Sequence, residues 1–195
     1  MKSLMIQGTA SGVGKTTLVA ALCRIFSDKG YKVAPFKSQN MSNFGYVTPD
    51  FEISRAQVIQ AIAARCKIEP DLNPIMLKPL GNYSSLVYLN GKRYKKMHAK
   101  DYYSNFVNTK GIKAATDSLF RLQNNNDLVI LEGAGSPAEI NLQKYDIANM
   151  KIAQKANASV LLVADIDKGG SFASLVGTMA LIEKKYQKLI KGFVL

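Results

Sequence analysis

The chain has 195 residues, and 26 Lys and Arg against 14 Asp and Glu give it a formal net charge of +12 at pH 7. Hydrophobic residues make up 47% of it, which excludes a disordered chain, and no run of about 18 apolar residues could span a membrane. The basic residues are scattered along the chain, which argues against a nucleic-acid-binding protein and favours a lysine-rich surface that attracts small polyanions.

The start of the chain predicts a phosphate-binding loop. The apolar run Leu4–Gln7 predicts a strand, a glycine-rich turn follows it, and the turn ends in Gly-Lys-Thr-Thr at the start of a helix predicted over Lys15–Lys29. Backbone N–H groups and the helix N-terminus would hold nucleotide phosphates there. Thr9 stands where the usual Gly-x4-Gly-Lys-Thr pattern has its first glycine, so the loop is a variant. The residues predicted to bind ATP are Gly12, Val13, Gly14, Lys15, Thr16 and Thr17.

The rest of the chain alternates apolar runs with helical patterns, which is typical of a parallel sheet. We therefore predict a single α/β domain of the P-loop NTPase type, with a mostly parallel sheet and helices on both faces. Residues 81–100 differ, because the alternating run Ser85–Leu89 ends in Asn90-Gly91 and predicts a hairpin or an excursion from the sheet edge. Further strands are predicted over Lys32–Phe36, Leu128–Leu131, Val160–Ala164 and Gly192–Leu195, and further helices over Glu52–Lys67, Tyr102–Gln123, Asp146–Ala156 and Ser171–Tyr186.

Charged residues follow the predicted strands at the edge of the sheet where ligands bind. Lys37 follows the second strand, Glu132 the third and Asp165 the fourth. We predict that Glu132 and the Thr16 hydroxyl bind Mg²⁺ and that Lys37 neutralises phosphate charge. The alternatives are helix caps for the two acids and a surface position for Lys37. The sequence has no nucleophile triad and no Cys or His metal motif, so the chemistry predicted is phosphoryl transfer by positioning and charge.

The two cysteines, Cys23 and Cys66, lie at apolar positions of helical patterns. Two buried free thiols are typical of a reducing compartment, so the sequence predicts a cytoplasmic protein. His98 belongs to no recognisable motif and is predicted to be a surface residue.

Several longer segments resemble the synthetase domains of the cobyric acid synthase family, which are dethiobiotin-synthetase-like, amide-forming ATPases. The resemblance runs through nearly the whole chain and is most specific in Lys37–Asn43 (KSQNMSN) and in residues 132–142 (EGAGSPAEINL). Ser38, Ser54 and Leu86 depart from the family pattern, and none of these positions supplies a phosphate or metal ligand. The matching segments also include Glu52–Gln57, Asn73–Pro79, Asp146–Met150 and Ala164–Gly170.

The resemblance implies ATP-dependent amidation of peripheral carboxylates of adenosylcobyrinic acid a,c-diamide, through acyl phosphates, in cobalamin biosynthesis. It implies Mg²⁺, a corrinoid substrate, and ammonia from glutamine through an amidotransferase domain in cis, which would make residues 1–195 an amidoligase domain truncated at its C-terminus. A homo-oligomer is left open. The catalytic residues implied are Lys15, Lys37 and Asp146, the metal ligands Thr16, Glu132 and Glu52, and the substrate contacts Gln39, Asn40, Ser42, Asn43, Gly135, Ser136, Asp165 and Asp167.

Two other interpretations share this fold and loop. Cobyrinic acid a,c-diamide synthase and dethiobiotin synthetase are related amidoligases, and the segment Lys37–Asn43 favours cobyric acid synthase over both. A partitioning-type ATPase that dimerises on ATP is the alternative from another class. Those ATPases have a lysine at the position of Ala10 that reaches the partner's nucleotide, and an alanine cannot do so.

Overall fold

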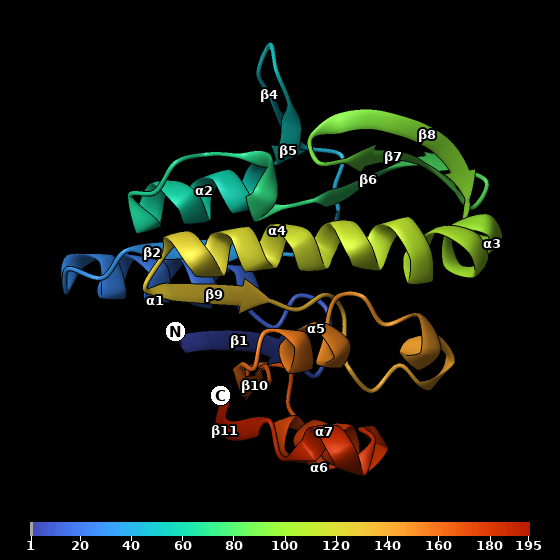
Figure 1. Cartoon of the computed structure of the whole chain (residues 1–195). Coiled ribbons are helices and arrows are strands. Elements are labelled where there is room, and N and C mark those ends of the chain that lie inside the picture. The colour runs from blue at the N-terminus through green and yellow to red at the C-terminus, as the bar shows by residue number, and fades with distance from the viewer. Residues whose placement is uncertain (1) are drawn as a thin grey trace.

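The computed structural model describes residues 2–195, and its centre is a sheet of five parallel strands (Figure 1). Their order is β11-β10-β1-β9-β2, so the first strand lies in the middle of the sheet. All four pairings are parallel, which places the carboxyl ends of the strands at one edge. The strands are β1 (Lys2–Gly8), β2 (Val33–Phe36), β9 (Leu128–Glu132), β10 (Ser159–Val163) and β11 (Ile190–Val194).

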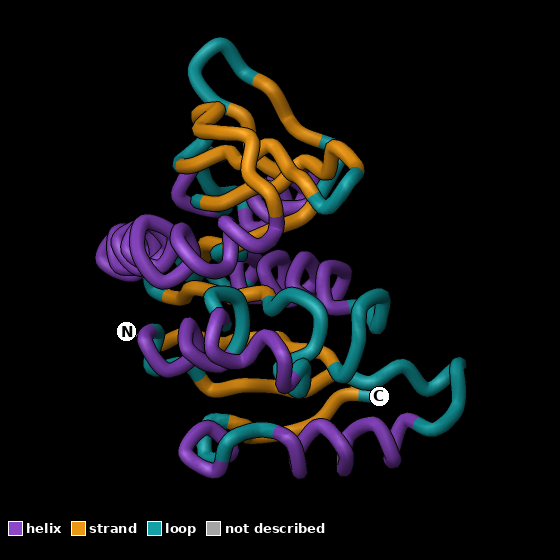
Figure 2. Tube along the Cα trace, turned by 90° about the vertical axis from the view of Figure 1, so that its right-hand side faces the viewer, coloured by secondary structure: helices purple, strands orange, loops and turns teal. Residues whose placement is uncertain are grey.

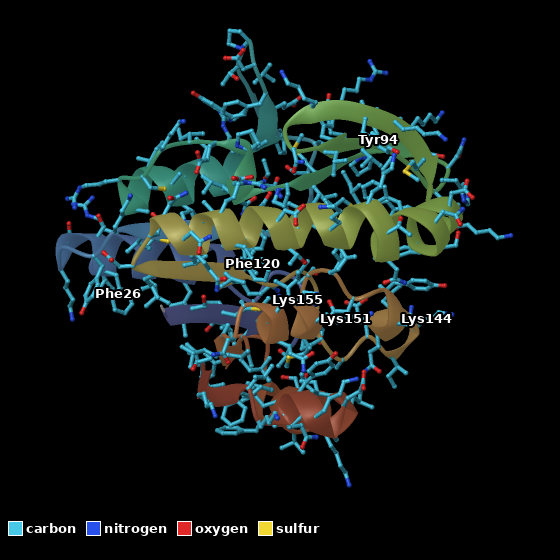
Figure 3. The ribbon with its side chains drawn as sticks, in the orientation of Figure 1. Phe26, Tyr94, Phe120, Lys144, Lys151 and Lys155 are labelled. Atoms are coloured by element: carbon cyan, nitrogen blue, oxygen red, sulfur yellow. The ribbon has the colours of Figure 1, made fainter. Side chains whose placement is uncertain are left out.

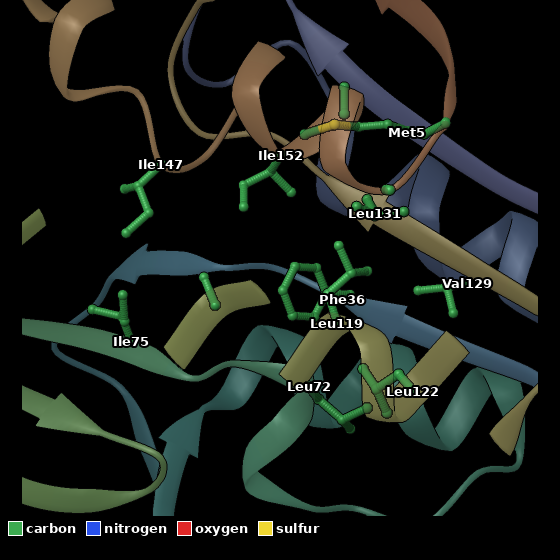
Figure 4. Packing of buried hydrophobic residues seen from close by; sticks show 14 of the residues in the cluster. Met5, Phe36, Leu72, Ile75, Leu119, Leu122, Val129, Leu131, Ile147 and Ile152 are labelled. Carbon is green, nitrogen blue, oxygen red and sulfur yellow. The ribbon is translucent and has the colours of Figure 1, made fainter. Parts of the chain in front are cut away.

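Helices cover both faces of this sheet, which confirms the predicted fold class. Successive residues of a strand face opposite sides. Ile6 packs with Val19 of α1 on one side, whereas Met5 packs with Leu119 of α4 and Ile152 of α5 on the other (Figure 4). The helices are α1 (Lys15–Asp28), α2 (Arg55–Ala64), α3 (Ala99–Asp101), α4 (Ile112–Asn125), α5 (Met150–Lys155), α6 (Ser171–Leu181) and α7 (Lys184–Gln187), with short 3₁₀ turns η1 (Pro70–Leu72) and η3 (Ile140–Tyr145).

A second, smaller sheet lies on the other side of α4 from the central sheet (Figure 1), and its strands are at the top of Figure 2. Its strand order is β3-β6-β7-β8, and a separate two-stranded hairpin pairs β4 with β5. The hairpin predicted within residues 81–100 is confirmed, because β7 and β8 pair antiparallel and Asn90 and Gly91 turn between them with φ of 48° and 75°. The strands are β3 (Gln39–Met41), β4 (Gly45–Val47), β5 (Glu52–Ser54), β6 (Ile75–Gly81), β7 (Ser84–Leu89) and β8 (Lys92–His98).

Two predicted helices begin later than the sequence pattern indicates. The helix predicted from Glu52 begins at Arg55, because Glu52–Ser54 pair with Gly45–Val47 instead. The helix predicted from Asp146 begins at Met150, and the Asp146 carboxylate accepts backbone N–H groups at its start.

For two other predicted helices, the structure shows whether each one is a single continuous helix. The helix predicted over Ser171–Tyr186 is divided, because Ile182 takes an extended backbone with ψ of 133°. The helix predicted over Tyr102–Gln123 is continuous, with wider π-helical turns η2 over Tyr102–Gly111 before α4 begins. None of the helices in residues 2–195 is long and apolar enough to cross a membrane.

Candidate nucleotide and substrate site

The turn between β1 and α1 folds around the side chain of Lys15. Gly12 and Gly14 adopt left-handed backbone conformations, with φ of 78° and 91°. Lys15 is the first residue of α1 and is buried, whereas most of the loop residues around it are exposed. Its Nζ donates to the Ala10 carbonyl at 2.8 Å and to the Gly135 carbonyl at 3.1 Å. The predicted phosphate-binding residues therefore form one accessible loop with a buried ammonium group beneath it.

Gly8 explains how the loop tolerates threonine where the usual pattern has a glycine. A Cβ on Gly8 would lie 2.5 Å from Val13 Cγ2 and 2.8 Å from Lys15 Nζ. Real Cβ atoms do not approach other atoms so closely, so a side chain at this position would force Val13 and Lys15 to move. The close approach of the backbone is supplied one residue earlier in the chain, and Thr9 does not need to supply it.

A buried carboxylate, Glu132, joins three of the elements around this loop. Its Oε1 accepts from Lys37 Nζ at 2.6 Å and from Thr16 Oγ1 at 2.8 Å. Its Oε2 accepts from Gln60 Nε2 at 2.5 Å, and the Glu132 residue is only 2% exposed. The structure thus brings together Thr16, Lys37 and Glu132, which the sequence predicts from three strand ends. Sequence reasoning missed Gln60, because a glutamine in a helical run gives no signal of its own.

Two lysines lie near this buried acid, and Lys37 is the one that forms an ion pair with it. Burial lowers the pKa of Lys15, and the neighbouring charge of Lys37 lowers it further, while Glu132 and Glu139 act in the opposite direction. Lys15 and Lys37 place two positive charges near Glu132 at the base of the loop. Such a site attracts a polyanion such as a triphosphate.

The donor set beside the loop fits a magnesium ion held together with a nucleotide. The Thr16 hydroxyl gives its hydrogen to Glu132, so the lone pairs of its oxygen remain for a cation. Within residues 2–195 no three His, Cys, Asp or Glu side chains gather as a metal-binding group. Mg²⁺ typically takes one or two protein ligands and completes its coordination with phosphate oxygens and water. Thr16 and Glu132 fit that pattern.

Glu52, the third predicted metal ligand, makes its contacts elsewhere. Its carboxylate forms an ion pair with Lys78 on β6 and lies where a Cβ on Gly45 would stand. The Lys78 ammonium also lies 5.1 Å from the centre of the Tyr88 ring. Burial and the hydrogen bond to Glu52 raise the pKa of Tyr88. In the described residues no hydrogen bond or ion pair connects Glu52 to Thr16 or Glu132.

The predicted substrate segment after β2 forms β3 and the turn that follows it. Gln39 Oε1 accepts from the Tyr102 hydroxyl at 2.6 Å. Asn40 Nδ2 donates to Ser54 Oγ at 2.7 Å and to Gln57 Oε1 at 2.9 Å. The Ser42 hydroxyl accepts from the Phe44 backbone at 3.1 Å, and Asn43 is exposed.

A cavity of about 220 Å³ adjoins the loop through Gly135. Four of the predicted catalytic or substrate residues line it: Gln39, Gly135, Ser136 and Asp146. Asn40, Ser42, Asn43, Asp165 and Asp167 are not among its lining residues. The structure also brings Tyr103, Glu139, Tyr145, Asn149, Ile182 and Tyr186 to this cavity, which sequence reasoning did not single out.

Asp146 lies in this cavity wall with its carboxylate already engaged. Its Oδ1 accepts from the backbone N–H groups of Ala148 at 3.0 Å and Asn149 at 2.7 Å, and its Oδ2 accepts from the backbone N–H of Lys151 at 2.9 Å. Lys144 and Lys151 flank this region on η3 and α5 (Figure 3), and Lys144 Nζ lies 4.9 Å from the centre of the Tyr145 ring. Asp146 therefore holds the start of α5 at the cavity wall, and the two lysines lie near the cavity without lining it.

Asp165 and Asp167 lie in the loop after β10, beside the phosphate-binding loop. Asp165 accepts from the Asp167 backbone at 3.0 Å and lies 3.2 Å from Lys168 Nζ. The hydrogen bond from Lys168 lowers the pKa of Asp165. A Cβ on Gly12 would lie 3.9 Å from Lys168 Nζ, so this loop contacts the nucleotide side of the site. Because β10 pairs with β1, the loop that follows β10 and contains Lys168 lies next to the loop that follows β1.

Comparison with solved structures supports the P-loop NTPase fold. The signal recognition particle receptor FtsY from Elizabethkingia anophelis is 20% identical, with a TM-score of 0.54 over 98% of this chain and 49% of the receptor chain. The cell division protein FtsY from Thermotoga maritima is 17% identical, with a TM-score of 0.52 over 98% of this chain and 51% of the other. At these identities the likeness shows the fold alone.

Curated proteins are more similar in sequence to this chain than these solved structures are. A probable cobyric acid synthase from Thermococcus kodakarensis is 53% identical over 99% of this chain, which spans 40% of that protein. A cobyric acid synthase from Dehalococcoides mccartyi is 51% identical over 100% of this chain, which spans 38% of that protein. A probable cobyric acid synthase from Methanococcus voltae is 49% identical over 100% of this chain and 84% of its own length.

The family assignment rests on the whole length of the domain. Residues 4–195 match the family described as CobQ/CobB/MinD/ParA nucleotide binding domain. The relative from Methanococcus voltae, at 49% identity, aligns along most of its own length as well. The chain therefore belongs to the CobQ/CobB/MinD/ParA nucleotide-binding-domain family and, within it, to the cobyric acid synthase family.

Proposed function

We propose that this chain is the ATP-dependent amide-forming part of a cobyric acid synthase. The observation that carries the proposal is the arrangement around Glu132, where Thr16 and Lys37 meet one buried carboxylate. Lys15 links this cluster through Gly135 to the cavity that contains Asp146. A phosphate site joined by a hydrogen bond to the wall of a neighbouring cavity suits the transfer of a phosphoryl group to a carboxylate arm placed in that cavity.

The reaction has two steps. A peripheral carboxylate of adenosylcobyrinic acid a,c-diamide attacks the γ-phosphorus of ATP, its oxygen bonds to phosphorus, and the bond to the ADP oxygen breaks with its electrons leaving on ADP. Ammonia then attacks the acyl carbon, phosphate departs with the electrons of the carbon–oxygen bond, and the nitrogen loses a proton to give the amide. A carboxylate is already ionised at neutral pH, so the first step requires no general base.

The side chains of the site would act mainly through charge. Lys15 and Lys37 would hold the terminal phosphates and offset the negative charge that develops on them. Mg²⁺, when bound by Thr16 and Glu132, supplies further charge neutralisation at the phosphates. Glu52 remains a proposed third ligand, and it would have to leave Lys78 to reach the ion.

The substrate contacts remain proposals of the same kind. Gln39, Gly135 and Ser136 line the cavity, and Lys144 and Lys151 beside it suit a corrinoid that carries several carboxylates. Asp146, Asp165 and Asp167 are proposed to hold ammonia or ammonium and to shape the substrate site. Asn40 lies within β3 and Ser42 and Asn43 follow it, and we propose that these three residues contact the part of the substrate outside the cavity.

A second polypeptide unit would supply the ammonia. The chain spans about 40% of the length of the first curated relatives, which leaves room in those proteins for a glutamine amidotransferase domain. α6 also buries Ser171 and Thr178 while it exposes Phe172 and Val176, an apolar face suited to packing against further chain. The free thiols Cys23 and Cys66 support a cytoplasmic location.

The proposal is tested by measuring ADP release with Mg²⁺ and ammonium chloride, with and without adenosylcobyrinic acid a,c-diamide. We expect release that depends on the corrinoid, with amide products detected by mass spectrometry. ADP release at the same rate without the corrinoid, and no amide product, would contradict the proposal and favour an ATPase switch.

A further inference from the structure

Three side-chain amides, two of them buried, connect the substrate segment to the carboxylate at the phosphate site. Asn40 Nδ2 donates to Gln57 Oε1 at 2.9 Å, Gln57 Nε2 donates to Gln60 Oε1 at 3.2 Å, and Gln60 Nε2 donates to Glu132 Oε2 at 2.5 Å. Each glutamine accepts from the previous donor and donates to the next acceptor. The chain of bonds therefore runs in one direction, from β3 to the end of β9.

The two glutamines lie on the face of α2 that meets the site. They are three residues apart, so their side chains project from the same side of the helix. Both are 0% exposed. A buried amide costs free energy unless its polar atoms are hydrogen-bonded, whereas an apolar side chain at the same place would not. Two glutamines on the buried face of a short helix therefore indicate a role beyond packing.

That role follows from how the oxygens of Glu132 are used. Oε1 accepts hydrogen bonds from the Lys37 ammonium and the Thr16 hydroxyl, and Oε2 accepts one from the Gln60 amide. Gln60 Nε2 also lies 3.3 Å from the Thr16 backbone carbonyl. Without Gln60 the carboxylate could rotate about its terminal torsion, which is a soft, roughly two-fold rotation, and Oε1 would no longer be fixed toward Thr16 and Lys37.

We propose that Gln57 and Gln60 are positioning residues for nucleotide cleavage, which hold the Glu132 carboxylate in its working orientation and connect it to Asn40 on β3. This inference rests on the proposed function, because the orientation matters only if Thr16 and Glu132 serve Mg²⁺ and phosphate. Partners that orient a metal ligand commonly change metal affinity or activity 10- to 100-fold when they are removed.

The test compares the Mg²⁺ concentration needed for half-maximal binding of a fluorescent ATP analogue. Gln60→Met keeps the size of the side chain and removes its donor, and we expect the Mg²⁺ requirement to rise about tenfold or more. Gln57→Met leaves Gln60 in place and should raise the requirement by a smaller factor, which provides a second variant should Gln60→Met not fold. Gln123→Met is the matched control, since this glutamine on α4 also forms two hydrogen bonds but contacts Ser3 and Ala156.

A double-mutant cycle separates positioning from a general loss of stability. If Gln60 acts through Glu132, Gln60→Met should raise the Mg²⁺ requirement no further in a Glu132→Gln background. Additive losses, or an unchanged Mg²⁺ requirement in folded Gln60→Met protein, would overturn the positioning role alone. Absence of Mg²⁺-dependent nucleotide binding by the unaltered chain would instead contradict the proposed function on which it rests.

Discussion

Lys15 and Gly135 are 120 residues apart in the sequence, and the Lys15 ammonium nitrogen lies 3.1 Å from the Gly135 carbonyl oxygen. This hydrogen bond connects the phosphate-binding loop to the wall of the cavity that Gly135 lines. A phosphate that arrives at the loop competes with Gly135 and Ala10 for the same ammonium group. Nucleotide binding is therefore expected to change the contacts of the segment that lines the cavity.

The first prediction concerns the charge of Lys15. Lys15→Ala should abolish measurable ADP formation and weaken ATP binding by about 100-fold or more, because a buried ammonium group is lost from the phosphates. Isothermal titration with ATP and Mg²⁺ measures the affinity directly. Lys168→Ala, which removes an exposed lysine beside the same loop, should change it by less than about fivefold. Comparable losses in the two variants would contradict the role given to Lys15.

The second prediction is a pH dependence. Burial and the charge of Lys37 lower the pKa of Lys15, so in the free protein this group loses its proton at a lower pH than an ordinary lysine. Only the protonated form attracts phosphate, and ATP affinity should therefore fall as the pH rises through that lowered pKa. The dissociation constant measured from neutral to alkaline pH checks this. Lys15→Arg should show no such fall, because arginine keeps its charge.

The same shift has a consequence for stability. Between the lowered pKa of Lys15 in the folded chain and its ordinary value in the unfolded chain, the unfolded state binds more protons. The contribution of this group to the free energy of unfolding therefore rises with pH across that window. A pH series of urea unfolding curves, compared with Lys15→Met, should show this rise only in the unaltered chain.

The third prediction tests the variant loop. Gly8→Ala should destabilise the chain and remove nucleotide binding, because the new Cβ would collide with Val13 and with Lys15 Nζ. Gly177→Ala is the matched control, since a Cβ there meets nothing within 4 Å in the middle of α6. This control should be neutral or stabilise by about 0.5–1 kcal/mol. Thermal unfolding with and without ATP distinguishes the two, and a fully functional Gly8→Ala protein would show that the loop is built differently.

The fourth prediction concerns Asp146. Its carboxylate accepts three backbone N–H groups at the start of α5, and an amide offers only one accepting oxygen. Asp146→Asn should therefore lower the free energy of unfolding by about 1–2 kcal/mol, leave ATP affinity intact and impair amidation. Asp117→Asn, which breaks an exposed ion pair on α4, should change stability by less than about 0.5 kcal/mol. Loss of ATP affinity in Asp146→Asn would reject the separate roles of the two sites.

The fifth prediction is slow thiol chemistry. Burial raises the pKa of the Cys66 thiol to about 11. Burial, together with the neighbouring Cys66, raises the pKa of the Cys23 thiol to about 12. At pH 8 only about one Cys66 thiol in a thousand is ionised, and the thiolate is the reactive form. A thiol reagent should therefore modify both cysteines slowly in the folded protein and rapidly in denaturant. Rapid modification of the folded protein would contradict the burial of Cys23 in α1 and the partial burial of Cys66, which lies after the end of α2.

Much of the fold follows from local sequence. Buried parallel strands have short apolar runs as their sequence pattern, so β1, β2, β9 and β10 are recognisable from their residues alone. β3 and β5 are not recognisable in this way, because three residues carry too little pattern to distinguish a strand from a turn. For the same reason the sequence places Glu52 within a helix, whereas pairing with the residues of β4 places it in a strand.

The site is predictable where a strand end marks it. Thr16, Lys37 and Glu132 each follow a recognisable strand or loop, and parallel strands bring such residues to one edge. Gln60 and Asn149 do not follow a strand, so no sequence pattern indicates that they belong to the site. Asn149 exchanges hydrogen bonds with the Ala134 backbone at 3.2 and 2.8 Å and thereby fixes the segment after β9. Contacts of this kind depend on distances between helices and loops, which the sequence alone does not specify.

The acyl phosphate mechanism is tested most directly by measuring whether an oxygen atom of the substrate carboxylate is transferred to the released phosphate. Adenosylcobyrinic acid a,c-diamide with isotopically heavy oxygen in its carboxylates is incubated with the chain, ATP, Mg²⁺ and ammonium chloride, and the phosphate released is analysed by mass spectrometry. If a substrate carboxylate attacks the γ-phosphorus, one heavy oxygen appears in phosphate for each amide formed. Phosphate that carries oxygen only from ATP and solvent would contradict the acyl phosphate and, with it, the proposed role of the Lys15, Lys37 and Glu132 site.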